Sequence, residues 1–206
     1  MKVAKVWVTP KAENVIANCA RVSNPNNQNN AETAPRLLKY LVKHKHWSPF
    51  EMASMCIEIE CTRDIARQIL RHRSFSFQEF SQRYAEAQDF ELSDLRMQDT
   101  KNRQNSIATD DKELKEKWIE LQKGTITTLN NIYQEALKNG VAKEVARKFL
   151  PEGFTMSRLY MSGTIRSWLH YLEVRCGPET QLEHRLVAGE IKKLLLIEVP
   201  SIMELV

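Results

Sequence analysis

Glycine and paired cysteines are scarce in this chain, and their scarcity excludes several common kinds of site. Only 6 of the 206 residues are glycine, and no Gly-x-Gly-x-x-Gly follows a β-rich run. A Rossmann-type cofactor site is therefore not supported. The four cysteines, Cys19, Cys56, Cys61 and Cys176, form no Cys-x-x-Cys pair. We therefore expect neither a zinc site nor a disulfide framework, and we interpret the cysteines as reduced thiols with mostly structural roles.

Long apolar runs and strong net charge are also missing. No run approaches the length of a membrane span, and Met1–Thr9 has two lysines without the apolar core of a signal peptide. These features predict a cytoplasmic protein with no membrane partner. The net charge of +4 favours an anionic ligand. A nucleic-acid partner is not expected, because such partners usually need a clustered basic face.

The length and composition fit one globular domain, which we assign to residues 1–206. Apolar residues make up 42% of the chain, enough for a sizeable core. Helical and strand patterns are mixed without regular βαβ alternation, which predicts an α+β fold with a mixed or antiparallel sheet packed by helices. Strands are predicted at Val3–Thr9, Met55–Cys61 and Phe154–Met161. Helices are predicted at 12–21, 37–44, 63–73, 114–138, 141–150, 165–175 and 179–197.

The helix at 114–138 is predicted to be long and amphipathic, and its apolar stripe indicates either core or a subunit interface. Three segments are expected to be irregular. Asn24–Asn30 is a polar loop, either a connector or a mobile lid. Ser93–Lys112 is poor in apolar residues and is expected to be a surface excursion with short turns. Ser162–Thr164 is expected to end the last strand and cap the helix that follows.

The stretch Arg71–Tyr84 holds a dense group of side chains suited to ligand binding. Within it lie three arginines, a histidine, three serines and a carboxylate. Arginine fits phosphate bidentately and stacks on flat rings, while hydroxyl and backbone N–H groups can complete a phosphate cradle. The stretch therefore predicts a pocket for a phosphate and a planar, hydrogen-bonding ring.

Part of this pattern also has a purely structural interpretation. In the predicted helix 63–73, Arg63, Arg67 and Arg71 share one face, and a charged helical face is usually solvated surface. His72 projects with the isoleucines of the opposite face, which favours a packing role for this histidine.

The order Arg71-His72-Arg73, seven further residues and then Ser81, followed by Arg83, resembles the signature of the flavin-dependent thymidylate synthases. Three other segments resemble motifs of that family and follow the family's order, so that the resemblance covers most of the chain. These segments are residues 46–51, 142–151 and 163–175.

The resemblance implies a fold, a reaction and an assembly. The fold is the α+β fold of this family, and the assembly is a homotetramer whose active sites are shared between subunits. The reaction is the reductive methylation of dUMP to dTMP, with methylenetetrahydrofolate as carbon donor and FAD and NADPH as the source of reducing equivalents. The resemblance also implies that no residue of the enzyme forms a covalent bond to the uracil ring.

The resemblance further assigns roles to individual residues, none of them at a metal. Arg175 is the expected catalytic residue, which would stabilise negative charge that develops on the uracil ring. The residues expected to bind dUMP are Gln68, Arg71, Glu79, Phe80, Ser81, Gln82, Arg83, Arg147 and Arg175. The residues expected to bind FAD are Ser23, His46, Ser48, Arg71, His72, Arg73, Glu79, Thr164, Ile165, Arg166 and His170.

Two alternatives remain open from the residues themselves. Cys176 beside Arg175, or Ser81 within the arginine cluster, has the chemistry of a nucleophile. A protein of another class, which binds single-stranded nucleic acid without catalysis, would stack bases on aromatic residues placed between arginines. Phe75, Phe77 and Phe80 have that placement.

Overall fold

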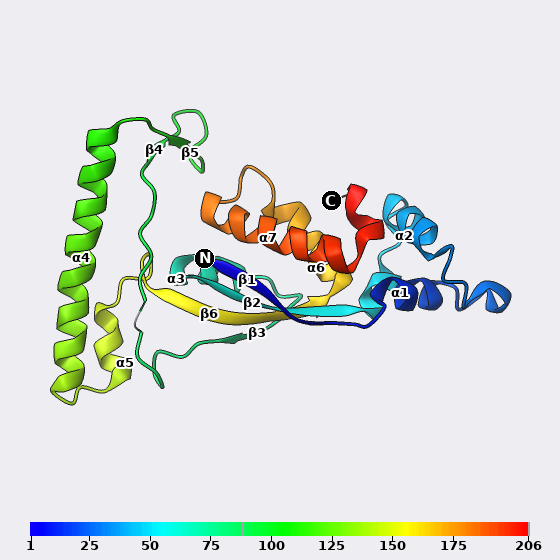
Figure 1. Ribbon diagram of the computed structural model, residues 1–206, viewed down its shortest axis with the longest axis horizontal. Coiled ribbons are helices and arrows are strands. Elements are labelled where there is room, and N and C mark those ends of the chain that lie inside the picture. The colour runs from blue at the N-terminus through cyan, green and yellow to red at the C-terminus, as the bar shows by residue number, and fades with distance from the viewer. Residues whose placement is uncertain (88, 206) are drawn as a thin grey trace. The chain divides into compact units, whose positions relative to one another are not determined.

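The computed structural model describes residues 1–87 and 89–205, and it contains both helices and strands (Figure 1). The chain divides into two compact units. Unit 1 comprises Met1, Glu60–Arg71 and Glu79–Leu159. Unit 2 comprises Lys2–Ile59, His72–Gln78 and Tyr160–Val206. The expectation of a single domain over the whole chain stays a prediction.

A four-stranded sheet has the strand order β1-β2-β6-β3. These strands are β1 (Lys2–Val8), β2 (Ser54–Thr62), β6 (Met156–Thr164) and β3 (Ser76–Glu79). The alternation predicted for β2 is present, since Met55, Ile57 and Ile59 have no exposed surface while Glu58 and Glu60 are half-buried. Such alternation follows from the two-residue period of a strand, which sends successive side chains to opposite faces of the sheet.

The helices of unit 2 enclose its core. They are α1 (Ala12–Ala20), α2 (Ala34–Lys43), α6 (Ile165–Arg175) and α7 (Leu182–Glu198), with short 3₁₀ helices at Pro25–Asn27, Ser48–Met52 and Pro200–Leu205. Helix α7 packs along α6 and against β1 (Figure 1). Trp168 and Tyr171 of α6 are among the largest fully buried side chains, and the Trp168 Nε1–H donates to the carbonyl of Met55 at 3.1 Å. This hydrogen bond fixes the rotation of α6 about its own axis relative to β2.

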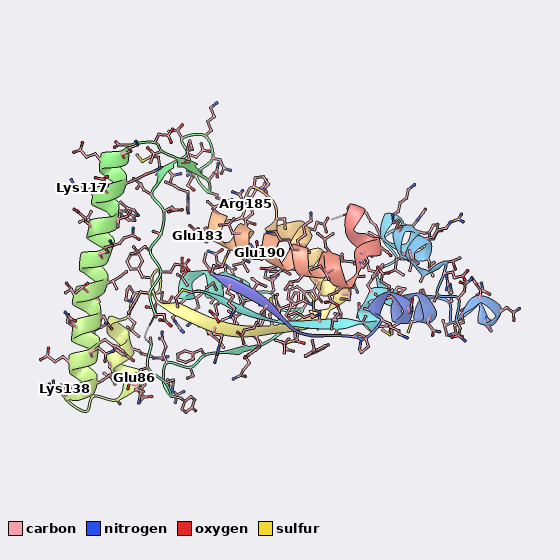
Figure 2. All side chains as sticks on the ribbon, viewed as in Figure 1. Glu86, Lys117, Lys138, Glu183, Arg185 and Glu190 are labelled. Atoms are coloured by element: carbon pink, nitrogen blue, oxygen red, sulfur yellow. The ribbon has the colours of Figure 1, made fainter. Side chains whose placement is uncertain are left out.

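Unit 1 contains the longest helix, α4 (Lys112–Lys138), with α3 (Arg63–Ile69), α5 (Lys143–Ala146) and a 3₁₀ turn at Arg147–Phe149. Asp111 caps α4 by accepting from the Leu114 N–H at 3.0 Å, and Gly140 follows the helix with a φ of 78°, a left-handed conformation that glycine adopts readily. Only Gln122 and Tyr133 of α4 are buried. Lys117 and Lys138 project from its exposed surface (Figure 2).

Two local predictions need correction, and strands occur in two segments where none is predicted. The helix predicted for 63–73 ends at Ile69, so Arg71 and His72 lie beyond it and Arg71 shares no helical face with Arg63 and Arg67. Ser162–Thr164 does not end its strand, because β6 continues through Thr164. Ser76–Glu79 forms a strand that local propensity does not predict. Each difference arises from tertiary packing, which overrides local propensity in short segments.

The second of these segments is the predicted surface excursion Ser93–Lys112, which contains a small antiparallel hairpin. Its strands are β4 (Arg96–Gln98) and β5 (Ser106–Ala108), with Arg96 opposite Ala108. Asp99 organises the turn by accepting from the backbone N–H groups of Lys101 and Asn102 at 2.8 and 3.1 Å. These hydrogen bonds lower the pKa of the Asp99 carboxyl, as expected where donors favour the charged form.

No helix among the described residues is long and apolar enough to cross a membrane.

Gly163 permits the close approach of an aromatic ring. A Cβ atom at this position would lie 2.4 Å from Phe75 Cδ1. The Phe75 ring cannot easily move away, because it packs against Trp168 with their centroids 4.6 Å apart. We therefore expect Gly163→Ala to lower the free energy of unfolding by about 1–3 kcal/mol, the usual cost of overpacking a core.

Denaturant unfolding measures this difference, and Gly189→Ala is the matched control. Gly189 lies within α7, and a Cβ atom added there would meet no atom within 4 Å, so alanine should raise stability by up to about 1 kcal/mol. Equal stability of the Gly163→Ala protein and the unsubstituted chain would show that the Phe75 ring does not constrain this position.

Candidate active site

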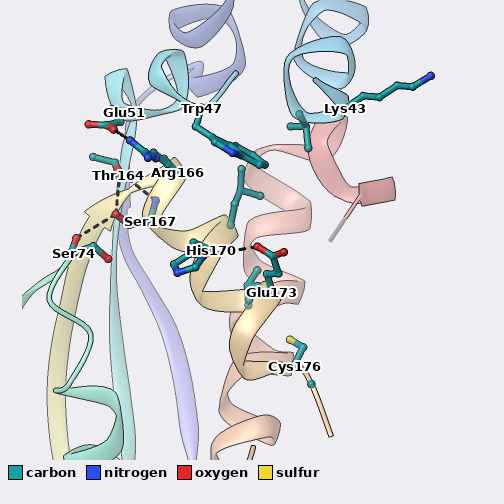
Figure 3. Close-up of a pocket in the computed structure, with 14 residues that line it drawn as sticks. Lys43, Trp47, Glu51, Ser74, Thr164, Arg166, Ser167, His170, Glu173 and Cys176 are labelled. Carbon is teal, nitrogen blue, oxygen red and sulfur yellow. Dashed lines mark hydrogen bonds and ion pairs between the residues drawn. The ribbon is translucent and has the colours of Figure 1, made fainter. Parts of the chain in front are cut away.

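One candidate site is a cavity of about 880 Å³ within unit 2. Its walls come from the end of α2, the 3₁₀ helix at Ser48–Met52 and α6 (Figure 3). The side chains that line it combine an indole, charged groups and hydroxyls. They include Trp47, Glu51, Ser74, Thr164, Arg166, Ser167, His170, Glu173 and Cys176.

The N-terminus of α6 forms one wall of this cavity, and hydroxyl groups organise it. The Thr164 Oγ1 caps the helix by accepting from the Ser167 N–H at 3.2 Å. The Ser167 hydroxyl donates to the backbone carbonyl of Ser74 at 3.2 Å. A helix N-terminus carries partial positive charge and unpaired N–H groups, so this wall favours an anionic group of a ligand.

Charged side chains flank the indole of Trp47 in the same cavity. Arg166 forms an ion pair with Glu51, and both side chains are almost half exposed. His170 lies one helical turn further along α6 and faces the same cavity (Figure 3). An aromatic face beside an arginine and a histidine suits a flat, polar ring system.

Arg175, at the end of α6, makes a hydrogen bond that fixes its guanidinium group. Its Nε–H donates to His72 Nε2 at 2.8 Å. An arginine nitrogen can only donate, so His72 Nε2 must present its lone pair and the ring proton must lie on Nδ1. No carboxylate of the described residues pairs with Arg175. Its positive charge is therefore available to an anionic ligand.

Two buried residues lie behind His72. The Tyr171 ring meets the His72 ring edge-on with centroids 4.8 Å apart, and the Tyr171 hydroxyl hydrogen-bonds to His184 Nε2 at 2.9 Å. Burial, and then the charge of Arg175, lower the pKa of His72 to about 4. The same two causes lower the pKa of His184 to about 3. Both imidazoles are therefore neutral at pH 7.

Unit 1 contains a separate cluster of charges centred on Glu79. One carboxylate oxygen of Glu79 lies 3.4 Å from Arg63 and accepts from the Ser157 hydroxyl at 2.9 Å, while the other lies 3.3 Å from Arg67. Glu152 also approaches both arginines. Because the Arg63 side chain is only 7% exposed, Glu79 compensates a charge that water hardly reaches.

Known proteins with similar sequences identify the family of this chain. A family model described as "Thymidylate synthase complementing protein" matches residues 5–201. A flavin-dependent thymidylate synthase of Synechocystis sp. is 48% identical over 190 residues, which are 92% of this chain and 87% of that protein. A probable flavin-dependent thymidylate synthase of Paramecium bursaria Chlorella virus 1 is 49% identical over 192 residues, which are 93% of this chain and 88% of that protein. The chain belongs to the flavin-dependent thymidylate synthase family.

A solved structure supports the fold of this family member. The UMP/dUMP methylase PolB from Streptomyces cacaoi, bound with 5-Br dUMP, matches with a TM-score of 0.85 and 24% identity, covering 98% of this chain and 94% of that chain. At this identity the likeness concerns the fold alone. The predicted family and the predicted α+β fold class are thus both confirmed.

Only some of the residues predicted to bind FAD line this cavity. Thr164, Arg166 and His170 line it. Ile165 has no exposed surface, and its N–H donates to the carbonyl of Ala53 at 2.8 Å. His72 lies instead against Arg175. The exposed residues Ser23, His46, Ser48 and Arg73 do not line the cavity.

The predicted dUMP residues lie almost entirely in unit 1. Arg175 belongs to unit 2, whereas Gln68, Arg71, Arg147 and the run Glu79–Arg83 belong to unit 1. Gln82 is 4% exposed, and its buried Nε2 has no hydrogen-bond partner among the described residues.

The other residues predicted to bind dUMP either contact other residues of the protein or are exposed to solvent. The Arg83 Nε lies 3.6 Å from Glu144, and the Arg83 N–H donates to the Ser81 hydroxyl oxygen at 3.3 Å. Phe80 lines a second cavity, of about 540 Å³, within unit 1. Arg71 is exposed and Arg147 is half-buried. Gln68 is half-buried and interacts with another group of the protein.

Sequence reasoning misses several residues of this site. The helical pattern places Arg63 on a solvated face, yet this residue is 6% exposed. Tyr171 and His184 do not stand out from the sequence, although a histidine within the apolar pattern of α7 is a usable signal. Glu51, Ser74 and Ser167 become visible only through their contacts across the fold.

The cysteines give no support to a nucleophilic mechanism. All four are free thiols in the structure. Cys176 lines the cavity, but burial raises the pKa of its thiol. Burial and neighbouring carboxylates raise the pKa of Cys61 to about 12. A raised pKa disfavours the thiolate, which is the reactive form of cysteine.

Removing the charge of Glu79 should destabilise unit 1. We expect Glu79→Gln to lower the free energy of unfolding by about 3 kcal/mol, because Arg63 would keep a buried charge without its main partner. Denaturant unfolding of the ligand-free protein measures this effect.

Glu144→Gln is the matched control for that measurement. Glu144 and its partner Arg83 are each more than half exposed, so the loss there should be below about 1 kcal/mol. If both substitutions cost the same, Glu79 does not serve to compensate a buried charge.

Proposed function

We propose that this chain catalyses the reductive methylation of dUMP at C5 to give dTMP, with methylenetetrahydrofolate as carbon donor and FAD and NADPH as the source of reducing equivalents. The observation that carries the proposal is the Arg175 guanidinium, held by a neutral His72 and unpaired with any carboxylate of the described chain. A fixed cation of this kind suits a reaction in which negative charge develops on a ring. Family membership restricts the ring to that of a pyrimidine nucleotide substrate.

The proposed role of Arg175 is electrostatic. Arginine stays protonated in proteins, so it cannot act as a general base. It can stabilise the charge that spreads over the uracil ring as C5 becomes nucleophilic, and a single preorganised donor of this kind commonly contributes a factor of about 10²–10³ in rate. No covalent bond from Cys176 or Ser81 to the ring is required.

The proposed dUMP residues offer both charge and directed hydrogen bonds. Arg71, Arg83 and Arg147 are cations suited to the phosphate. The buried Nε2 of Gln82 lacks a protein partner, and a buried donor without a partner is costly, so an acceptor on the ligand would satisfy it. Gln68, Phe80 and Ser81 complete the proposed set. We assign Glu79 mainly to holding Arg63 and Arg67, which it contacts.

The large cavity of unit 2 fits part of a flavin nucleotide. Its volume lies within the range of about 300–1,000 Å³ that is usual for ligand pockets. Arg166 and the N-terminus of α6 would receive a phosphate, while Trp47 and His170 would lie against a ring. Ser23, His46, Ser48 and Arg73 remain proposed contacts toward the same cofactor. Bound FAD, once reduced, supplies the hydride of the reaction.

We also propose that the enzyme is a cytoplasmic homotetramer with active sites shared between subunits. Support comes from α4, which leaves apolar side chains such as Ile119, Leu121 and Ile132 in contact with solvent. Exposed apolar residues gathered on one helix are typical of interaction surfaces. No nucleic-acid or membrane partner forms part of the proposal.

The burial of the aromatic residues argues against the alternative, a protein that binds single-stranded nucleic acid. Phe75 is 9% exposed and packs against Trp168, so it has no free face on which a base could stack. Phe77 and Phe80 are half-buried. A stacking platform requires open aromatic faces along the strand.

The decisive assay measures dTMP formation from dUMP in the presence of FAD, NADPH and methylenetetrahydrofolate, with each omitted in turn. Each omission should abolish turnover, and added dUMP should perturb the flavin absorption spectrum. A protein that takes up no flavin and binds oligonucleotides with steep salt dependence would support the alternative class.

Arg175→Ala should lower kcat/KM for dUMP by a factor of about 10²–10³, because the charge that stabilises the ring is removed. Cys176→Ser should retain most of the activity, and so should Arg36→Ala, which removes an exposed arginine of α2. A folded but inactive Cys176→Ser enzyme would contradict the non-covalent mechanism.

A further inference from the structure

Tyr171 and His184 are buried polar residues to which the proposed chemistry gives no task. Neither has exposed surface. Their side chains are joined by the hydrogen bond of 2.9 Å between the Tyr171 hydroxyl and His184 Nε2. Burying such groups is costly even when they are paired, so an apolar pair would serve better if packing were their whole purpose.

Their position links them to Arg175 through one intermediate side chain. The Tyr171 ring meets the His72 ring edge-on at 4.8 Å, and the His184 ring lies 6.5 Å from His72 at 88°. His72 in turn accepts the hydrogen bond from Arg175 at 2.8 Å. The buried rings of Tyr171 and His184 and the half-buried ring of His72 thus form a continuous contact that ends at the guanidinium group.

The bond to Arg175 exists only while His72 is neutral with its proton on Nδ1. The charged and titratable groups that face His72 are Arg175, His170 and Tyr171 of α6 and His184 of α7, and the Phe75 ring also meets it edge-on. Of these, His184 is neutral at pH 7, and the buried side chains of Tyr171 and His184 exclude water from one side of the ring. Exclusion of water disfavours the imidazolium, and the positive charge of Arg175 acts in the same direction.

We propose that Tyr171 and His184 are positioning residues for Arg175: they keep the His72 ring dry and in one orientation, so that its Nε2 receives the Arg175 Nε–H. The catalytic consequence rests on the proposed function, whereas the orientation of His72 is a property of the protein alone. The two can therefore be tested separately.

The first experiment observes His72 without any turnover. In the unsubstituted protein, ¹⁵N spectra of labelled histidines should show His72 with its proton on Nδ1 and titrating near pH 4. In Tyr171→Phe and in His184→Leu, His72 should become a mixture of tautomers, and its titration should move upward by about one unit or more, toward its ordinary value. His184→Gln, which keeps a hydrogen-bonding partner for Tyr171, should restore much of the original spectrum.

Tyr133→Phe is the matched control. The Tyr133 hydroxyl is also buried and hydrogen-bonded, since it accepts from the Ala87 N–H at 3.4 Å in unit 1. Its removal should cost stability as Tyr171→Phe does, but leave the His72 spectrum unchanged. Wild-type tautomer and titration of His72 in both Tyr171→Phe and His184→Leu would overturn the proposal.

The second experiment measures the catalytic consequence. In Tyr171→Phe, kcat should fall by between about ten- and a hundredfold, the usual loss when a catalytic group is misplaced, while KM for dUMP changes less. The acid limb of the pH–kcat profile should also move upward with the His72 titration, a shift that general loss of stability would not cause. An unshifted acid limb in an enzyme whose His72 titration has moved would contradict the link to Arg175.

Failure of the proposed function gives a different pattern. If the unsubstituted protein forms no dTMP, yet Tyr171→Phe alters the His72 tautomer and Tyr133→Phe does not, the positioning role stands and the assigned reaction does not.

Discussion

The hydrogen bond between Arg175 and His72 is the interaction on which the proposed site depends. A charged histidine would make this contact repulsive, by about 4 kcal/mol for two unit charges about 4 Å apart at an effective dielectric constant of about 20. The fold must therefore keep His72 neutral, and it does so by packing the half-buried ring against Tyr171 and beside His184. Desolvation is accordingly the largest cause of the lowered pKa of His72. The consequence is a strict dependence of the site on water exclusion.

The arginines of the two units differ in whether a carboxylate neutralises their charge. In unit 1, Arg63 and Arg67 are both compensated by Glu79, so these arginines serve the structure more than a ligand. In unit 2, Arg175 has a neutral partner and keeps its full charge for a ligand. A carboxylate in place of His72 would hold the guanidinium equally well, but it would cancel the charge that the proposed reaction uses.

Sequence reasoning succeeded where the pattern was long or strictly periodic. The alternation of β2 and the length of α4 both follow from local repeats of apolar residues. It failed where contacts distant in sequence decide the structure: the end of α3 at Ile69, strand β3, and the burial of Arg63 beside Glu79. The family motifs located His72 and Arg175. Of their partners, Tyr171 carries no local signal that separates it from ordinary packing residues, whereas His184 stands out only as a histidine within the apolar pattern of α7.

Helix α6 positions both the side chains that line the cavity and the arginine that contacts His72. Gly163 allows Phe75 to pack closely, β6 then continues to Thr164, and Thr164 caps the helix. Arg166 and His170 are four residues apart, so they face the same cavity. Arg175 follows five residues later, about 140° further around a helix of 3.6 residues per turn, and therefore points to a different side, where it meets His72. The rotation of α6, fixed by the hydrogen bond from Trp168 to Met55, thus determines the direction of both groups together.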